Sequence, residues 1–254
     1  MSELFEKTAV IILAAGKGTR MKSGRAKVLH EINAVPMIHY VVKTALSVTA
    51  EDVFIVVGHQ AAEVESVVSA CFKVNFVLQK EQKGTGHAVQ CVLPYLSETI
   101  KHIVILCGDV PLLTSHTVHE LLVGHQRLHN DITVLAVNVV DPKGYGRVII
   151  NGNREIERIV EDADASDRQK EITLINTGIY CVKKAVLESI LGQIRANNVQ
   201  NEFYLTDIVG IGNRRGLKLG VEIGGNPQEV IGINDSKELS RAEKILLSSR
   251  GETA

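Results

Sequence analysis

Tryptophan is absent from this chain of 254 residues, and aromatic residues make up only 4% of it. Cysteine is scarce as well, and the four cysteines show no CxxC spacing, so we expect reduced thiols packed on strands and helices: Cys71, Cys91, Cys107 and Cys181. No uninterrupted apolar run reaches the roughly 18 residues of a membrane-spanning helix. The N-terminal segment has no basic stretch before a long apolar run, so no signal peptide is expected.

An excess of charge is also missing, since the formal net charge is −1 at pH 7. This balance gives no reason to expect a nucleic-acid partner, whose phosphate backbone would call for a basic surface. With no membrane span and no leader, we expect no membrane partner and a cytoplasmic location. Apolar residues make up 45% of the chain, which indicates a globular protein with a sizeable core.

Strand and helix patterns alternate through the first half of the chain. Four short runs rich in valine and isoleucine predict strands that are covered on both faces: Ala9–Leu13, Val53–Val57, Val74–Leu78 and Ile103–Leu106. Amphipathic patterns between and after them predict helices: Met37–Ser47, Ala61–Cys71, Gly86–Leu93 and Ser115–Leu128. This alternation predicts an α/β fold with a doubly wound, mostly parallel sheet.

The pattern becomes richer in strands after Asp131. Closely spaced strands are predicted at Ile132–Val140, Arg147–Ile150 and Glu155–Val160, with a hairpin turn at 151–153, and we interpret them as a β-rich insertion beside the main sheet. Later elements are two strands, a helix between them and a final helix: Leu174–Val182, Leu217–Ile223, Lys183–Ile194, and 236 to about 250. Ser236 is expected to cap that last helix, although Asp235 competes for the role.

No linker rich in serine, glycine or proline divides the chain. We therefore expect one domain over residues 1–254. Within it we distinguish a first part of about 1–130, a second of about 131–235 and a C-terminal helix at 236–254.

The most informative stretch is Ala9–His30, AVIILAAGKGTRMKSGRAKVLH. A strand ends at Leu13, Ala14, Ala15 and Gly16 and runs into a glycine-rich turn, at the strand edge where open α/β sheets bind ligands. Glycines let the backbone approach a ligand, and Arg20 and Lys27 add two cations on the same loop. This pattern favours polyphosphate binding over a dinucleotide fold, whose GxGxxG spacing is not met. Two solvated surface cations are the simpler alternative.

A second glycine-rich turn lies at Gln79–Ala88, where a strand ends and Gly-Thr-Gly opens a helix. The carboxamide of Gln79 offers a donor and an acceptor side by side, which suits a pyrimidine edge. Gly84 would let the backbone reach the base, and Thr85 could donate to a ligand. The alternative is an ordinary helix-capping turn with a neutral glutamine on its rim. We read His87 as a helix-start residue and not as a catalytic base.

A carboxylate, Asp109, follows another buried strand in the string LCGDVPL. Such an aspartate is either a turn former or a metal ligand. Mg²⁺ is a hard cation that usually takes one or two protein carboxylates together with substrate phosphates. Chemistry on a bound polyphosphate would need such an ion, and from the residues alone both roles stay open.

Together these strings resemble the sugar nucleotidyltransferases, and most closely the uridyltransferase half of the bacterial enzyme that makes UDP-N-acetylglucosamine. The resemblance covers about residues 8–250 and rests on LAAGKGTRM…KVLH, QKEQKGTGHA, GDVPL, GYGR, IVE, INTG and EVIGIN. It implies a Rossmann-like sheet with a sugar-binding insertion, so that the first part of the domain holds the nucleotide and the second the sugar.

The resemblance also implies roles for individual residues. The nucleotide would be contacted by Leu13, Ala14, Ala15, Gly16 and Thr85. Uracil would be recognised by Gln79 and Gly84. Arg20 and Lys27 would be catalytic, and Asp109 with Asn234 would hold Mg²⁺. Gly146, Glu161 and Asn176 would bind the N-acetylhexosamine. The implied reaction is the Mg²⁺-dependent transfer of UMP from UTP to N-acetylglucosamine 1-phosphate, with release of pyrophosphate.

The chain departs from the family pattern at three points. Ala26 stands where a proline usually precedes the lysine of KVLH, and Cys107 stands where an aromatic residue is more frequent. The hexapeptide repeats of the family's left-handed β-helix are missing, so we expect no acetyltransferase activity and a monomer. Two alternatives stay open: a relative that uses another sugar 1-phosphate or nucleotide, and a catalytically weak regulatory protein that binds nucleotide sugars.

Overall fold

A computed structural model describes residues 8–152 and 155–251. The N-terminal residues on which the expectation of no signal peptide depends lie outside this range, as does Asn153 of the expected hairpin turn. Among the described residues, no helix is long and apolar enough to cross a membrane.

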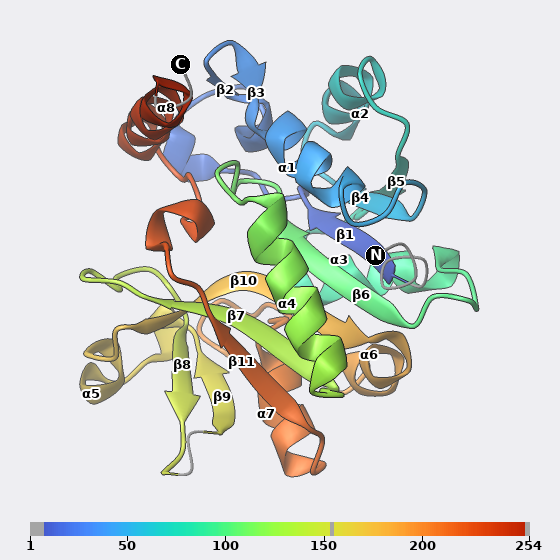
Figure 1. Cartoon of the computed structure of the whole chain (residues 1–254), viewed down its shortest axis with the longest axis vertical. Helices are drawn as coiled ribbons and strands as arrows, with labels where there is room; N and C mark the ends of the chain where they lie inside the picture. Colours follow the sequence, from blue (N-terminus) through green and yellow to red (C-terminus); the bar gives the residue numbers. More distant parts are fainter. Residues whose placement is uncertain (1–7, 153–154, 252–254) are drawn as a thin grey trace.

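A nine-stranded sheet runs through the molecule (Figure 1). Its main path has the order β11-β7-β10-β6-β1-β4-β5, and β8 and β9 extend from β10. The strands are β1 (Thr8–Leu13), β4 (Val53–Val57), β5 (Asn75–Leu78), β6 (His102–Cys107), β7 (Ile132–Asn138), β8 (Arg147–Ile150), β9 (Ile156–Val160), β10 (Leu174–Lys183) and β11 (Leu219–Ile223). The mostly parallel α/β sheet predicted from the sequence is confirmed.

Strand direction changes at a single strand of the main path. β1 pairs in parallel with β4 and β6, β4 with β5, and β11 with β7, whereas β10 runs antiparallel to both β6 and β7. β8 and β9 form an antiparallel hairpin beside β10. The expected β-rich insertion is therefore confirmed only for the β8–β9 hairpin. Its first predicted strand, Ile132–Val140, was wrongly placed there, because β7 pairs with β10 and β11 within the main sheet.

Helices cover both faces of the sheet, because alternate strand residues point to opposite sides. One face packs against α1 (Met37–Leu46), α2 (Ala61–Ser69) and α4 (Ser115–Arg127). The other face packs against α3 (Thr85–Val92), α6 (Lys184–Leu191) and α7 (Asp207–Arg214). Val10 and Ile12 of β1 enter the first core and Ala9 and Ile11 the second, all with no exposed surface.

The C-terminal helix α8 (Ser236–Gly251) lies against the small ribbon of β2 (Glu31–Ile32) and β3 (Val35–Pro36), far from β8 and β9 (Figure 1). Ala242 of α8 packs there with Ile32, Met37 and Ile233. Asp235 caps the helix, since its Oδ1 accepts from the backbone N–H groups of Lys237 and Glu238, both at 2.9 Å. The expectation that Ser236 is the cap is wrong: Ser236 is the first helical residue.

Five further short turns complete the chain as 3₁₀ segments. They lie at 19–21, 27–29, 93–95, 162–164 and 227–230, and the short helix α5 (Asp167–Lys170) follows the fourth of them. The first two belong to the glycine-rich loop after β1. This loop therefore has defined local structure at both of its predicted cationic residues.

Candidate active site

A cavity of about 650 Å³ opens at the carboxyl ends of the parallel strands. It is lined by most of the residues predicted for nucleotide and phosphate binding: Leu13, Ala14, Ala15, Gly16, Arg20, Lys27, Gln79, Gly84, Thr85, Asp109 and Asn234. These residues lie at or after three separate strand ends, those of β1, β5 and β6, or in the loop before α8. The parallel sheet brings them together because the carboxyl ends of its strands share one edge.

Four charged or polar side chains converge on the wall of this cavity. The Lys27 ammonium donates to Asp109 Oδ2 in a very short ion pair and to Asn234 Oδ1 at 2.7 Å. Arg20 Nη2 donates to the same Asn234 oxygen at 2.8 Å. The side chain of Lys27 is only 13% exposed, so its charge is partly withdrawn from water and its pairing is strengthened. The two predicted catalytic cations and the two predicted metal ligands thus form one cluster.

Gly18 explains how Lys27 reaches this position. Gly18 has a φ of +60°, and a Cβ placed on it would lie 2.4 Å from the Cβ of Lys27. A side chain there would meet both steric overlap and an unfavourable left-handed backbone. Gly16 differs, because no described atom lies within 4 Å of the corresponding position. Gly18 therefore makes room for Lys27, and Gly16 leaves its backbone open to the cavity.

The donor set fits a hard divalent cation. Asp109 and Asn234 each direct an oxygen atom at the same ammonium group, so both oxygens can reach a single cation centre. Mg²⁺ prefers oxygen ligands and usually keeps only one or two protein carboxylates. Asn234 is fixed from behind, since its backbone N–H donates to Glu238 Oε2 at 2.6 Å and its Nδ2 donates to the Gly232 carbonyl at 3.0 Å.

Gln79 is held in place at the end of β5. It is 3% exposed, and its Nε2 donates to the Gly84 carbonyl at 3.1 Å and contacts His87 Nδ1 at 3.0 Å. These two contacts fix the plane of the carboxamide. His87 thus helps to position Gln79 and lies in the first turn of α3, as expected for a helix-start residue.

Gly84 has a structural requirement beyond ligand approach. Its φ is +107°, and a Cβ would lie 2.7 Å from the Phe203 carbonyl oxygen and 2.8 Å from the Phe203 nitrogen. The backbone of Phe203 pairs with this turn, because it accepts from Gly86 N–H and donates to the Lys83 carbonyl, both at 2.8 Å. Thr85 Oγ1 accepts from Leu205 N–H at 3.0 Å, which leaves its own proton available to a ligand. The contacts with the 202–205 segment were not visible in the sequence.

The residues predicted for sugar binding form a second group. Asn176 N–H donates to the Gly146 carbonyl at 2.8 Å, and a Cβ on Gly146 would lie 3.3 Å from Glu161 Oε2. Glu161 accepts from Thr206 Oγ1 at 2.9 Å, while burial raises the pKa of its carboxyl. Glu161 lines a separate cavity of about 200 Å³, and none of the three residues lines the 650 Å³ cavity.

A bulge in β10 connects the two groups. The register of β10 against β7 shifts between Asn176 and Tyr180, and Gly178 in the bulge has a φ of +79°. A Cβ on Gly178 would lie 2.7 Å from the sulfur of Cys107, which lines the large cavity. Bulges often redirect side chains next to active sites. Here the bulge turns the Asn176–Gly178 segment toward the end of β6.

A smaller cavity of about 190 Å³ shares Arg20, Cys107, Asp109 and Asn234 with the large one. It adds residues that we did not single out from the sequence: Lys143, Tyr145, Thr177, Gly232 and Glu238. Burial raises the pKa of Tyr145 to about 12, and the carboxylates of Glu238 and Asp109 contribute to the increase. Tyr145 belongs to the GYGR string, which was the only sequence signal for it.

A sheet-edge cavity with a glycine-rich loop, two cations and two side-chain oxygen donors is the arrangement expected of a nucleotidyltransferase. The chain belongs to the family of MobA-like NTP transferase domains, which matches residues 10–175. Its curated relatives include the bifunctional protein GlmU of Geotalea uraniireducens, 42% identical over 238 residues, which cover 94% of this chain and 52% of the relative.

Two further relatives carry the same name. The bifunctional protein GlmU of Cyanothece sp. (strain PCC 7425) is 43% identical over 94% of this chain and 52% of its own length. That of Corynebacterium efficiens is 38% identical over 95% of this chain and 51% of its own length. The chain therefore spans about half the length of the curated relatives it matches.

Proposed function

We propose that this chain transfers UMP from UTP to N-acetylglucosamine 1-phosphate, giving UDP-N-acetylglucosamine and pyrophosphate with the help of Mg²⁺. The observation that carries the proposal is the convergence of Arg20, Lys27, Asp109 and Asn234 on the wall of the 650 Å³ cavity. The similarity to proteins named GlmU supports the choice of substrates.

Transfer of UMP requires that the two substrates are positioned in line and that the negative charge of their phosphates is neutralised. A phosphate oxygen of the sugar phosphate attacks the α-phosphorus of UTP in line, and pyrophosphate leaves. The attacking phosphate is already anionic at neutral pH, so no general base is needed. Lys27 would steady the transferred group and the incoming phosphate, and Arg20 would neutralise the departing pyrophosphate. Mg²⁺, held by Asp109 and Asn234, would supply further neutralisation of the phosphates.

Uracil recognition is assigned to the Gln79–Gly84 turn. The Gln79 carboxamide lies in a fixed plane on the cavity wall and can offer a donor and an acceptor to a pyrimidine edge. Thr85 lines the same cavity and retains a hydroxyl proton that can be donated. These features support a uridine nucleotide at the far side of the cavity from the Lys27 cluster.

Sugar recognition is assigned to Gly146, Glu161 and Asn176. The proposal is supported by the hydrogen bond from Asn176 to Gly146, by the closeness of Gly146 to Glu161, and by the β10 bulge that brings Gly178 to Cys107. Carboxylates, amides and close backbone are the groups that bind hydroxyl and acetamido substituents. Cys107 lines both the 650 Å³ and the 190 Å³ cavity. It is smaller than the aromatic residue frequent at this position in the family, so it leaves more room where it lines them.

A substrate panel tests the proposal. The full chain is incubated with each nucleoside triphosphate and each hexose 1-phosphate in the presence of Mg²⁺, and pyrophosphate release is measured. We expect release with UTP and N-acetylglucosamine 1-phosphate to exceed every other pair by at least ~10-fold. A different preferred pair would identify the related transferase instead. Absence of release, with nucleotide sugar bound by calorimetry, would favour the regulatory alternative.

A further inference from the structure

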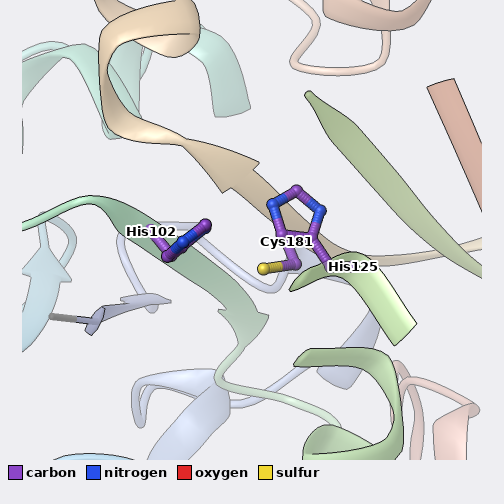
Figure 2. Close-up of side chains that lie close together, drawn as sticks. All are labelled: His102, His125 and Cys181. Carbon is purple, nitrogen blue, oxygen red and sulfur yellow. The ribbon is translucent and has the colours of Figure 1, made fainter. Parts of the chain in front are cut away.

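Three side chains meet at the end of the sheet opposite the candidate active site. His102 is the first residue of β6, His125 lies in the last turn of α4, and Cys181 lies near the end of β10. One ligand atom from each residue lies within 4.8 Å of the other two. Figure 2 shows the Cys181 sulfur beside the two imidazole rings, with the three side chains arriving from different elements.

Two imidazole nitrogens in this cluster have no hydrogen-bond partner within residues 8–152 and 155–251. They are Nδ1 of His102 and Nε2 of His125, and both atoms are buried. His125 as a whole has no exposed surface, and neither does Cys181. A buried polar group without a partner costs about 1–3 kcal/mol, so such groups call for a missing partner.

One tautomer of His125 leaves its unpartnered nitrogen as a lone pair. His125 Nδ1 lies 2.8 Å from Thr133 Oγ1, which also accepts from Asn130 Nδ2 at 3.1 Å. When Nδ1–H donates to the threonine, Nε2 is left unprotonated, which is the arrangement found for imidazoles that bind metals. Burial lowers the pKa of both His102 and His125, that of His125 to about 3, which favours the neutral form of both rings.

The nearest fixed charges are already compensated. Lys183 donates to Asp131 Oδ1 at 2.8 Å, and Asp131 also accepts from Lys218 N–H at 2.9 Å. This pair lies beside the histidines, and Lys183 contributes to the lower pKa of both. His102 also lines a cavity of about 400 Å³ together with Lys101, Lys184, Glu98 and Glu188. The cavity reaches the cluster at His102 and has room for a water molecule.

We propose that His102, His125 and Cys181 bind Zn²⁺, with a water molecule from the adjoining cavity as the fourth ligand. Two imidazole nitrogens and one sulfur suit a borderline-soft divalent ion, whereas Mg²⁺ requires oxygen ligands. Zinc–nitrogen and zinc–sulfur bonds of about 2.0–2.3 Å place tetrahedral ligand atoms about 3.3–3.7 Å apart. The cluster therefore needs to contract by about an ångström, which side-chain rotation can supply.

Binding has a defined proton balance and a structural effect. The S–H bond of Cys181 breaks, its proton leaves to solvent, and the thiolate sulfur bonds to the metal. The ion then joins α4, β6 and β10, and it stabilises the folded state by mass action. The site is separate from the proposed Mg²⁺ donors. His102 begins β6, whereas Asp109 follows the other end of this strand, which is Cys107.

The test is titration of the full chain with Co²⁺ and Zn²⁺ in excess Mg²⁺ and a weak competing chelator. We expect one tightly bound ion per chain, a tetrahedral Co²⁺ spectrum with a thiolate charge-transfer band in the near ultraviolet, and a higher Tm with Zn²⁺. Cys181→Ser should abolish the charge-transfer band. His102→Gln should weaken Zn²⁺ binding by at least ~10-fold. Cys71→Ser removes an exposed cysteine and should leave all readouts unchanged.

The wild-type protein alone can overturn the proposal, because failure to bind a stoichiometric ion above the chelator would refute it. It would also be refuted by a thiolate band that survives in Cys181→Ser, or by one that disappears in Cys71→Ser. Cys181 and His125 are fully buried, and their variants could unfold. His102 is only partly buried, so His102→Gln keeps the test decisive in a folded protein.

Discussion

The nucleotide side and the sugar side of the candidate site are built differently. On the nucleotide side, Lys27, Asp109 and Gln79 come from loops at the ends of parallel strands and open onto one cavity of about 650 Å³. On the sugar side, Glu161 and Asn176 are bonded to protein groups and stand outside that cavity. Both groups have protein partners, since Lys27 bonds to Asp109 and Asn234 just as Glu161 bonds to Thr206. What differs is that the first group carries the paired charges and opens onto the large cavity, whereas the second lies outside it.

The difference suggests how each side responds to mutation. Side chains that already touch each other around the phosphate position should affect turnover, because their contribution lies in charge stabilisation. Side chains outside this charged cluster should affect mainly substrate affinity, since they would contact parts of the substrate that do not change charge in the reaction. The predictions below test this division, beginning with the largest expected effect.

Asp109→Asn should produce the largest loss. It keeps the shape of the side chain but removes the charge that pairs with Lys27 and would hold Mg²⁺. We expect kcat to fall by at least ~10³-fold, which corresponds to roughly 4 kcal/mol of barrier. Pyrophosphate release at saturating substrates measures it, with exposed Asp141→Asn as the control. A loss of less than ~10-fold would remove Asp109 from the metal role.

Lys27→Ala should lower kcat by about 10²–10³-fold, because the transferred phosphate loses a partly buried cation. The variant also removes the 2.7 Å bond to Asn234. Single-turnover measurements separate this effect from binding. Lys80→Ala, which removes an exposed cation beside the base-recognition turn, should behave like the wild type. If Lys27→Ala altered only the KM for sugar phosphate, the division between the two sides would fail.

Glu161→Gln should raise the KM for N-acetylglucosamine 1-phosphate by about 10-fold, because a charged hydrogen-bond acceptor becomes neutral. kcat should change little. Glutamine can still accept from Thr206, so the local fold is preserved. Steady-state kinetics with varied sugar phosphate measure the split. A loss confined to kcat would place Glu161 with the phosphate cluster instead.

The same substitution should change how stability depends on pH. Burial raises the folded-state pKa of Glu161, although its bond to Thr206 opposes the change. The folded wild type therefore binds more protons than the unfolded chain between the two pKa values, and its stability falls as pH rises through that window. Glu161→Gln lacks this loss, so its Tm relative to wild type should increase from pH 4 to pH 7 in thermal unfolding scans. An unchanged Tm difference would contradict the pKa shift.

Gln79→Ala should reduce the preference for UTP over CTP by about 10-fold, which is the effect of losing one or two hydrogen bonds to the base. The ratio of kcat/KM values for the two nucleotides is the measurement. Gln90 is exposed on the following helix, and Gln90→Ala is a matched control. An unchanged ratio would show that the base is read elsewhere.

Ala26→Pro should have the smallest effect. It tests whether the glycine-rich loop after β1 already has its binding conformation before a ligand binds. Ala26 already has φ −53° and ψ 134°, which a proline can adopt. We expect the free energy of unfolding to rise by about 0.4–1 kcal/mol in urea denaturation. Activity should be unchanged or higher. Destabilisation would show that the buried site has no space for the ring.

The sequence predicts the local elements well, because buried strands have continuous apolar runs and helices have a distinct period. Val53–Val57 and Arg147–Ile150 are confirmed with the same bounds, and most other ends differ by one or two residues. The direction of β10 could not be predicted in this way. A buried strand has the same apolar pattern whether it runs parallel or antiparallel to its neighbours.

Contacts between distant segments were also beyond the sequence. Lys27 and Asn234 were each assigned a role by resemblance, but their shared hydrogen bond joins residues 207 positions apart. The packing of Phe203 against Gly84, and the meeting of His102, His125 and Cys181, have no local signal. Such contacts depend on how helices and strands pack against one another. The residues next to each side chain in the sequence therefore do not predict them.

The close approach of Gly18 and Lys27 has a consequence for the length of the loop between them. The lysine stem occupies the space that a side chain on residue 18 would fill. The number of residues between the two positions therefore fixes where the Lys27 ammonium group lies. Adding or deleting one residue between them would leave each half of the loop locally acceptable and still displace the ammonium group. Amino-acid substitutions between Gly18 and Lys27 should therefore be tolerated better than insertions or deletions there.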